Sequence, residues 1–311
     1  MLLSIENKYS YAIQERLVKV VSMAGYVNLS LHLLDSMLGM TSDTDLSSMA
    51  MYTTSEIYIP SYMAYTSVLN RLRKWKKIDA MRLTLRKLSH ACKIDGKGQT
   101  LDIVALNTYL AAICDSMKTR NEGEKDVELM REAMDLLYPG VAMDKYTLPK
   151  PDVMSFNTVL NAAAEMKNGT LVSEAILLMK KQGLAPDIVT YNALLKAAPT
   201  AEFKVAVVDE ILEESGLVAD RYTVEMALMP LTDEGRVADL LNLLHGFTSS
   251  EQPEFAVQNA YSTFLLALIK VRHFLMDSCV CIEHIHFVLC YVLCALIQAL
   301  THSELELLSI I

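Results

Sequence analysis

One short pattern recurs along the chain at regular intervals, and this periodicity limits its possible folds more than any other feature. Three eight-residue segments align with one another: 103–110 (IVALNTYL), 153–160 (VMSFNTVL) and 188–195 (IVTYNALL). Each follows an Asp and carries Asn at its fifth position, whereas the related segment 62–69 (YMAYTSVL) carries Thr there. A period of about 20 to 50 residues indicates a stack of small units rather than one large core.

Each unit is expected to form a hairpin of two helices. In 153–187, apolar residues recur at intervals of three and four from Phe156 onward, as an amphipathic helix requires. The Asn168-Gly dipeptide predicts a break, and a second helix is expected from about Ser173 to Gly183. Such a hairpin cannot bury its own apolar side, so its neighbours must cover it. We therefore predict an all-α fold, a right-handed α-solenoid of tandem helix-turn-helix repeats.

The pattern divides the chain into seven segments. They are an N-terminal degenerate repeat at 1–61, a repeat at 62–102, a repeat with an insertion at 103–152, repeats at 153–187 and 188–220, a degenerate repeat with the start of a further one at 221–270, and a hydrophobic segment at 271–311. The last segment departs abruptly from the repeat pattern. We interpret it as the product of a gene model that reads through an intron or a frameshift.

Composition agrees with a helical protein and argues against several other classes. Hydrophobic residues make up 52% and charged residues 21%, which excludes a disordered chain. Leu, Ala and Met outweigh the β-branched and aromatic residues that strands favour. Six unevenly placed Cys without a secretory leader indicate a reducing compartment. Residues 1–14 show neither a signal peptide nor a transit peptide.

Charge is distributed unevenly along the chain. The total of 28 Lys and Arg against 37 Asp and Glu gives −9, but residues 1–102 carry 13 against 9, or +4, and the remainder carries 15 against 28, or −13. The candidate phosphate contacts lie in the basic stretch 71–97: Arg71, Arg73, Lys74, Lys76 and Lys77. The alternative is a solvated outer helix face, since Arg82 and Arg86 are four residues apart.

Motifs of catalysis and metal binding are missing from the sequence. We find no zinc-protease motif, nucleophile elbow, phosphate-binding loop or paired-Cys zinc spacing. Residues 279–294 hold four Cys and two His, but three such ligands spread along one helix cannot converge on one ion. The uncharged run 287–300 is shorter than the roughly 20 residues that span a membrane. We expect no enzymatic activity, metal, cofactor, small-molecule substrate or membrane anchor.

The repeats resemble those of the pentatricopeptide repeat family, most clearly over 102–220 and more weakly over 5–266. This resemblance implies single-stranded RNA as the partner, with about one base bound per repeat and read by the fifth and the last residue of the repeat. Carried over by position, the pairs are Thr66 with Asp102, Asn107 with Asp152, Asn157 with Asp187, and Asn192 with Asp220. In the family, Thr with Asp favours guanine and Asn with Asp favours uracil. The implied core is 5′-guanine-uracil-uracil-uracil-3′.

The resemblance also implies a mitochondrial or chloroplast location and a role in RNA processing, stability or translation, with RNA-processing proteins as further partners. Two departures stand out: the unit 103–152 has extra chain around 138–149, and the unit that begins at Arg221 has Glu225 at its fifth position. A more local interpretation is that the Asn residues are turn residues and that each Asp caps the helix after it.

Two other functions stay open at the level of the sequence. A protein-binding helical scaffold would use the acidic second half to meet a basic partner. The chain would alternatively be the RNA-binding part of an enzyme similar to protein-only RNase P, whose catalytic domain would be rich in Asp and absent from these 311 residues.

Overall fold

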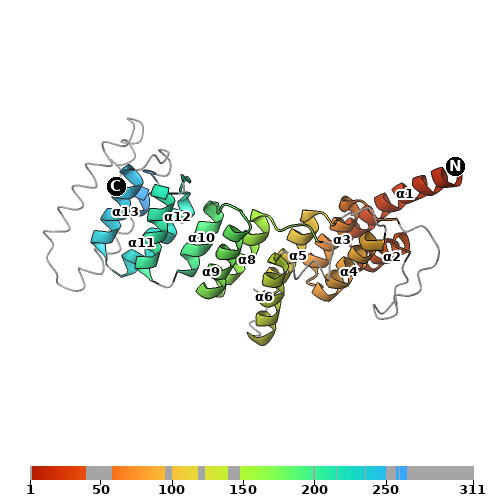
Figure 1. The fold of residues 1–311 in the computed structure, drawn as a ribbon, viewed down its shortest axis with the longest axis horizontal. Coiled ribbons are helices and arrows are strands. Elements are labelled where there is room, and N and C mark those ends of the chain that lie inside the picture. Colours follow the sequence, from red (N-terminus) through yellow and green to blue (C-terminus); the bar gives the residue numbers. More distant parts are fainter. Residues whose placement is uncertain are drawn as a thin grey trace. The chain divides into compact units, whose positions relative to one another are not determined.

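The computed structural model describes residues 2–39, 58–94, 100–117, 123–138, 148–198, 200–214, 216–234, 236–249, 257–258 and 260–264. These residues form helices joined by turns, with no strand among them (Figure 1). The chain divides into two compact units. The first consists of Met1–Ala162 and Ala175–Ala185, and the second of Ala163–Glu174 and Pro186–Ile311.

The first unit is a series of helical hairpins. Its helices are α1 (Leu2–Ala24), α2 (Val27–Met37), α3 (Tyr62–Lys74), α4 (Ile78–Ile94), α5 (Ile103–Met117) and α6 (Gly123–Leu137), together with parts of α8 (Val153–Glu165) and α9 (Gly169–Lys181). The helices α1, α3 and α5 each pack on the second helix of their own hairpin, and α1 also contacts α3 and α3 contacts α5. This stacking buries the apolar stripe of each hairpin, including the fully buried ring of Tyr109.

The second unit repeats the same packing. It contains α10 (Ile188–Ala197), α11 (Ala201–Asp209) with a π-helical turn at Glu210–Glu214, α12 (Arg221–Asp233) and α13 (Val237–Ser249). The first helices α10 and α12 pack together, as do the second helices α11 and α13. Leu195, Leu228 and Phe247 lie in their common core. The tandem hairpins of the two units confirm the predicted all-α solenoid class.

The first helix of a hairpin ends in the same turn in three repeats. Gly25, Lys76 and Lys167 follow α1, α3 and α8 with φ angles of 95°, 55° and 53°. In the last two turns, the next residue donates its backbone N–H to a carbonyl five residues back: Lys77 to Leu72 at 3.0 Å and Asn168 to Ala163 at 3.1 Å. A left-handed residue in this position closes a helix and reverses the chain.

The prediction that the second helix of 153–187 begins near Ser173 is wrong, because α9 begins at Gly169. The side chain of Asn168 explains the earlier start. Its Oδ1 accepts the backbone N–H of Leu171 at 3.2 Å and the hydroxyl of Thr170 at 2.6 Å. Asn168 therefore acts as an N-cap: the predicted break between the two helices is present at 166–168, and the second helix begins directly after it.

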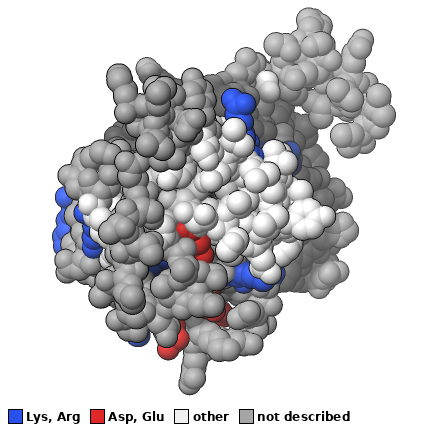
Figure 2. All heavy atoms as spheres, turned by 90° about the vertical axis from the view of Figure 1, so that its right-hand side faces the viewer, with Lys and Arg blue, Asp and Glu red and all other residues white. Residues whose placement is uncertain are grey.

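The outer side of α1 exposes several apolar side chains. Ile13, Val20 and Met23 are each more than 60% exposed, and Leu17 is 45% exposed. Figure 2 shows uncharged side chains over much of the described surface in this view, with Asp and Glu at and below their centre and Lys and Arg around them. The described part of α1 thus presents an apolar side that no other described residue covers.

Several predictions fall on residues that the structure does not describe. They include most of the insertion around 138–149, the Cys and His residues at 279–294, and the hydrophobic segment 271–311. Among the helices that are described, none combines the length and the apolar composition needed to cross a membrane. In the same part of the chain, no group of three or more His, Cys, Asp or Glu side chains is placed to hold a metal ion.

Candidate functional site

In the first unit, the structure brings together the fifth residue of one repeat and the last residue of that repeat. Asn107 lies on α5, and Asp152 directly precedes α8. The Asn107 Nδ2 atom lies 3.3 Å from Oδ1 and 3.5 Å from Oδ2 of Asp152. The hydroxyl of Ser155, the third residue of the next repeat, donates to Asn107 Oδ1 at 2.6 Å and lies 2.9 Å from Asp152 Oδ1.

The second unit contains the same cluster. The Asn192 Nδ2 atom lies 3.3 Å from Oδ1 and 3.2 Å from Oδ2 of Asp220. The hydroxyl of Thr223, again the third residue of the next repeat, donates to Asn192 Oδ1 at 2.7 Å and lies 2.8 Å from Asp220 Oδ1. Two separate pairs that the sequence predicts are therefore joined by a third side chain that it did not predict.

The Asp residues also start the helices that follow them. Oδ1 accepts the backbone N–H of the residue three positions on: Ser155 for Asp152 at 2.8 Å, Thr223 for Asp220 at 2.7 Å, and Thr190 for Asp187 at 2.9 Å. Asp187 and Thr190 form a complete capping box. The local interpretation of these Asp residues as caps thus describes one role of Oδ1, and in Asp152 and Asp220 both carboxylate oxygens also face the amide of the Asn in the same repeat.

The pair Asn157 and Asp187 falls in both units, so each residue is placed within its own. Asn157 is half-buried on α8 in the first unit. Asp187 precedes α10 in the second unit, where it caps that helix together with Thr190. Both residues hold the same positions along their helices as their counterparts in the two complete clusters.

Thr66 and Asp102 bond differently from the Asn-containing pairs. The Thr66 hydroxyl donates to the carbonyl of Tyr62 at 2.5 Å, within its own helix. Asp102 Oδ1 accepts the backbone N–H of Val104 at 2.8 Å, and its own N–H donates to the hydroxyl of Tyr65 at 3.0 Å. The third residue of the next repeat is Ala105, which has no hydroxyl to offer.

Glu15 is a fifth-position residue that the sequence analysis missed. It lies ten residues before the left-handed Gly25, as Thr66 does before Lys76 and Asn157 does before Lys167. Its Oε1 accepts the backbone N–H of Ser61 at 2.6 Å and the hydroxyl of Tyr58 at 3.1 Å. The spacing to the helix-ending turn was the available signal, but α1 lacks the Asn pattern that aligned the other repeats.

The candidate phosphate contacts fall into two groups: the two Arg side chains bind other groups of the protein, whereas the three Lys side chains are exposed. The Arg71 guanidinium donates to the carbonyls of Ser22, at 2.8 Å, and Met23, which closes the end of α1. Arg73 forms an ion pair with Asp115 of α5 at 2.8 Å. The remaining three, Lys74, Lys76 and Lys77, are exposed, and the Lys77 ammonium lies 5.4 Å from the centre of the Trp75 ring.

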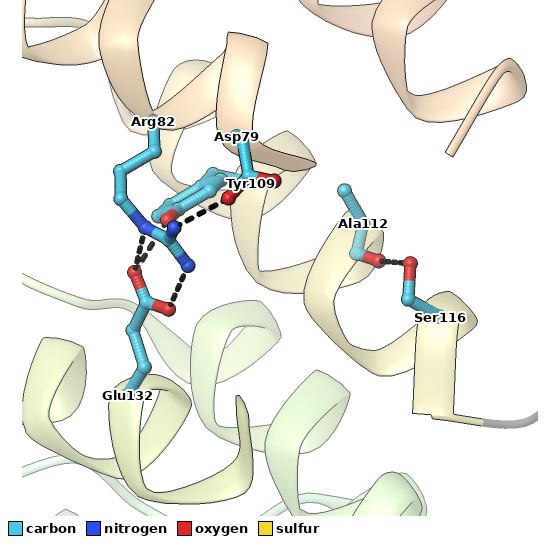
Figure 3. A network of polar contacts seen from close by, with 6 residues as sticks. All are labelled: Asp79, Arg82, Tyr109, Ala112, Ser116 and Glu132. Atoms are coloured by element: carbon cyan, nitrogen blue, oxygen red, sulfur yellow. Dashed lines mark hydrogen bonds and ion pairs between the residues drawn. The ribbon is translucent and has the colours of Figure 1, made fainter. Parts of the chain in front are cut away.

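Arg82 is not on a solvated outer face, which corrects one of the two interpretations of the basic stretch. Its guanidinium contacts both carboxylate oxygens of Glu132 on α6, at 3.1 and 2.7 Å, and Asp79 at 2.8 Å (Figure 3). The hydroxyl of Tyr109 donates to the same Glu132 at 2.5 Å. Burial by itself raises the pKa of Glu132, but the hydrogen bonds from Arg82 and Tyr109 outweigh it, so the pKa is lowered overall.

Tandem helical hairpins that stack on one another, with a polar cluster recurring at the start of their first helices, define a helical-repeat protein. Residues 149–199 match the family model described as the pentatricopeptide repeat domain. The predicted resemblance to the pentatricopeptide repeat family is thus confirmed. The matched segment contains α8, α9 and α10, including Asn157, Asp187 and Asn192.

Solved structures of the pentatricopeptide repeat protein PPR10 are among those similar to this chain. One, in complex with an 18-nt psaJ RNA element, is 20% identical, with a TM-score of 0.43, covering 89% of this chain and 39% of that one. Another, from maize, is 19% identical, with a TM-score of 0.37, covering 85% and 38%. This chain therefore spans about two fifths of the length of those proteins. No curated protein sequence matches it.

Proposed function

We propose that the chain binds single-stranded RNA, with each repeat reading about one base through its fifth and last residues. The observation that carries this proposal is the cluster of Asn, Asp and a hydroxyl, which recurs with the same bonds in two separate units. The match of residues 149–199 to the pentatricopeptide repeat model supports it further. A shared local turn would not require Asn to face the Asp of its own repeat in both places.

The hydrogen bonds of the cluster favour uracil. In Asn192, Oδ1 is taken by the Thr223 hydroxyl and one Nδ2 hydrogen faces Asp220. The second Nδ2 hydrogen is a donor, and the Asp220 carboxylate has further acceptor capacity beside it. Uracil presents an N3–H donor next to a carbonyl acceptor, which matches this arrangement. Asn107 with Asp152 has the same groups in the same order.

The pairs Thr66 with Asp102 and Asn157 with Asp187 complete the proposed site at equivalent repeat positions. Together the four pairs read 5′-guanine-uracil-uracil-uracil-3′. Lys74, Lys76 and Lys77 supply the phosphate contacts, because their ammonium groups are exposed. The excess of acid elsewhere in the chain makes such binding weak and sensitive to salt.

The proposed role is non-catalytic and lies in RNA processing, stability or translation inside a mitochondrion or chloroplast. Its support is the resemblance to the pentatricopeptide repeat family. In this role the chain positions other RNA-processing proteins on the transcript that it selects.

The test is a fluorescence-anisotropy titration of the full chain with short RNA containing 5′-GUUU-3′, against RNA in which adenine replaces each uracil. We expect tighter binding to the uracil RNA, and loss of that preference in the double variant Asn107→Ala with Asn192→Ala. Asn242→Ala is the matched control, because Asn242 is exposed on the second helix α13. Equal binding to both RNAs in unmodified protein contradicts base reading.

A protein-binding scaffold is the second candidate, and the exposed apolar side chains of α1 favour it. Binding of that kind depends on Ile13, Val20 and Met23, and it is indifferent to the Asn residues of the repeats. If the chain binds no RNA at either of two salt concentrations, this candidate replaces RNA binding.

A further inference from the structure

We infer that Ser155 and Thr223 are positioning residues for base reading: each hydroxyl holds the amide of the preceding repeat's Asn so that Nδ2, rather than Oδ1, meets the base. This inference rests on the proposed RNA binding and concerns the orientation of the groups that perform it. It adds a third residue to the pair that the family resemblance assigns to each repeat.

The orientation of the amide follows from the atoms around it. If the Asn192 amide were reversed, its Oδ1 would lie at 3.2 to 3.3 Å from the Asp220 carboxylate, where two acceptors repel. In the observed orientation, Nδ2 donates to the carboxylate and Oδ1 accepts from Thr223 at 2.7 Å. The carboxylate disfavours the reversed amide, and the hydroxyl adds to this preference by donating to Oδ1.

The position of the two hydroxyls excludes direct contact with RNA. Ser155 and Thr223 are both completely buried, with an exposed fraction of 0%. Asn107 and the two Asp residues are partly exposed, whereas Asn192 is 8% exposed. A base can therefore approach the Asn107 amide and both carboxylates, and it meets the small exposed part of Asn192, whereas both hydroxyls are out of its reach. Any influence of Ser155 or Thr223 on base choice must pass through the Asn or Asp that it touches.

The sequence places a hydroxyl only where an amide needs orienting. Five repeats are followed by a repeat with an assigned start, and among them Asn107, Asn157 and Asn192 are followed at the next third position by Ser155, Thr190 and Thr223. Thr66 and Glu15 are followed instead by Ala105 and Ala64. Only an amide has an oxygen and a nitrogen whose places can be swapped by rotation; a Thr hydroxyl and a Glu carboxylate do not, so they need no such partner. Helix capping alone would not link the third residue to the fifth residue of the repeat before it.

The experiment measures base preference position by position, with the full chain. Binding of 5′-GUUU-3′ RNA is compared with RNA carrying adenine at the second base only or at the fourth base only. We expect Ser155→Ala to reduce the preference for uracil at the second base by about fivefold, and Thr223→Val to do so at the fourth base, the size of one lost hydrogen bond. Each variant leaves the other position unchanged.

Conservative variants and a thermal melt separate positioning from simple loss of structure. Ser155→Thr and Thr223→Ser keep a hydroxyl and are expected to keep the preference. An equal loss of preference at both bases, in step with a lower melting temperature, overturns the inference in favour of a structural role. If Ser155→Ala and Thr223→Val both keep the preference for uracil over adenine, the inference is also overturned, but the proposed RNA binding stands. Absence of RNA binding by unmodified protein overturns both.

Discussion

The Lys87 ammonium lies 2.9 Å from each carboxylate oxygen of Asp35, and both side chains are almost completely buried. Lys87 lies on α4 and Asp35 on α2, so this ion pair joins the second helices of two successive hairpins. Burial raises the pKa of Asp35, and the opposing effect of Lys87 does not fully cancel it. The pair is therefore costly to form and more costly to break.

Removing only one partner of this pair should destabilise the first unit strongly. We expect Lys87→Met to lower the free energy of unfolding by about 3–5 kcal/mol, because Asp35 is left buried without a counter-charge. The double variant Lys87→Met with Asp35→Leu should recover most of that loss. Denaturant titration measures the free energy of unfolding of the single and the double variant. Lys181→Met, on the exposed side of α9, is the control and should change this free energy by less than about 0.5 kcal/mol. Losses that simply add in the double variant would contradict this account.

Glu132 stabilises the fold at neutral pH, and this contribution should be lost in acid. Its folded-state pKa is lowered, so its contribution is complete above its ordinary value of 4.5 and is lost as the pH falls through the lower folded value. We expect Glu132→Gln to lower the free energy of unfolding by about 1–2 kcal/mol at pH 7. The difference in free energy of unfolding between the variant and unmodified protein should shrink as the pH falls toward 3. Thermal melts from pH 7 to pH 3 check this. A gap that widens in acid would contradict it.

The left-handed Lys residues offer a test by gain of stability. Because a side chain disfavours positive φ, Lys76→Gly and Lys167→Gly should each raise the free energy of unfolding by about 0.5–1 kcal/mol. Lys74→Gly, in the last turn of α3, should lower it by about 1 kcal/mol. Melting temperatures that fall in all three variants would show that these turns are not strained by their side chains.

The exposed Lys residues after α3 should set the salt dependence of RNA binding. We expect Lys74→Gln, Lys76→Gln and Lys77→Gln together to reduce the slope of log K against log salt by about 2, at about 0.7 per single-strand phosphate contact. The preference for uracil over adenine should be unchanged, since phosphates carry no sequence information. Lys180→Gln with Lys181→Gln on α9 is the matched control. An unchanged slope would remove these residues from the interface.

The register of the repeats was predictable because two sequence features define it: the apolar spacing, and the Asp that directly precedes α5, α8, α10 and α12. Local geometry was harder to predict. Lys is not a residue that usually marks a left-handed turn, so Lys76 and Lys167 gave no signal. The early start of α9 depends on the Asn168 side chain, which serves equally well in a turn or as a cap.

The third member of each polar cluster was beyond prediction from the sequence for a different reason. Ser155 lies 48 residues from Asn107, and Thr223 lies 31 residues from Asn192. These partners meet only because successive first helices pack side by side. Likewise, Arg82 and Glu132 are 50 residues apart, so the spacing of Arg82 and Arg86 along one helix could not reveal the contact with Glu132.

The most direct test of base reading is a change of specificity at one repeat. Asn192→Thr turns the fourth pair into the combination found at the first pair, Thr with Asp. The predicted result is that 5′-GUUG-3′ RNA binds more tightly than 5′-GUUU-3′ RNA to this variant, the reverse of the order for unmodified protein. Anisotropy titrations of the full chain with both RNAs measure it. The same order of affinities in variant and unmodified protein would contradict base reading by the fifth residue.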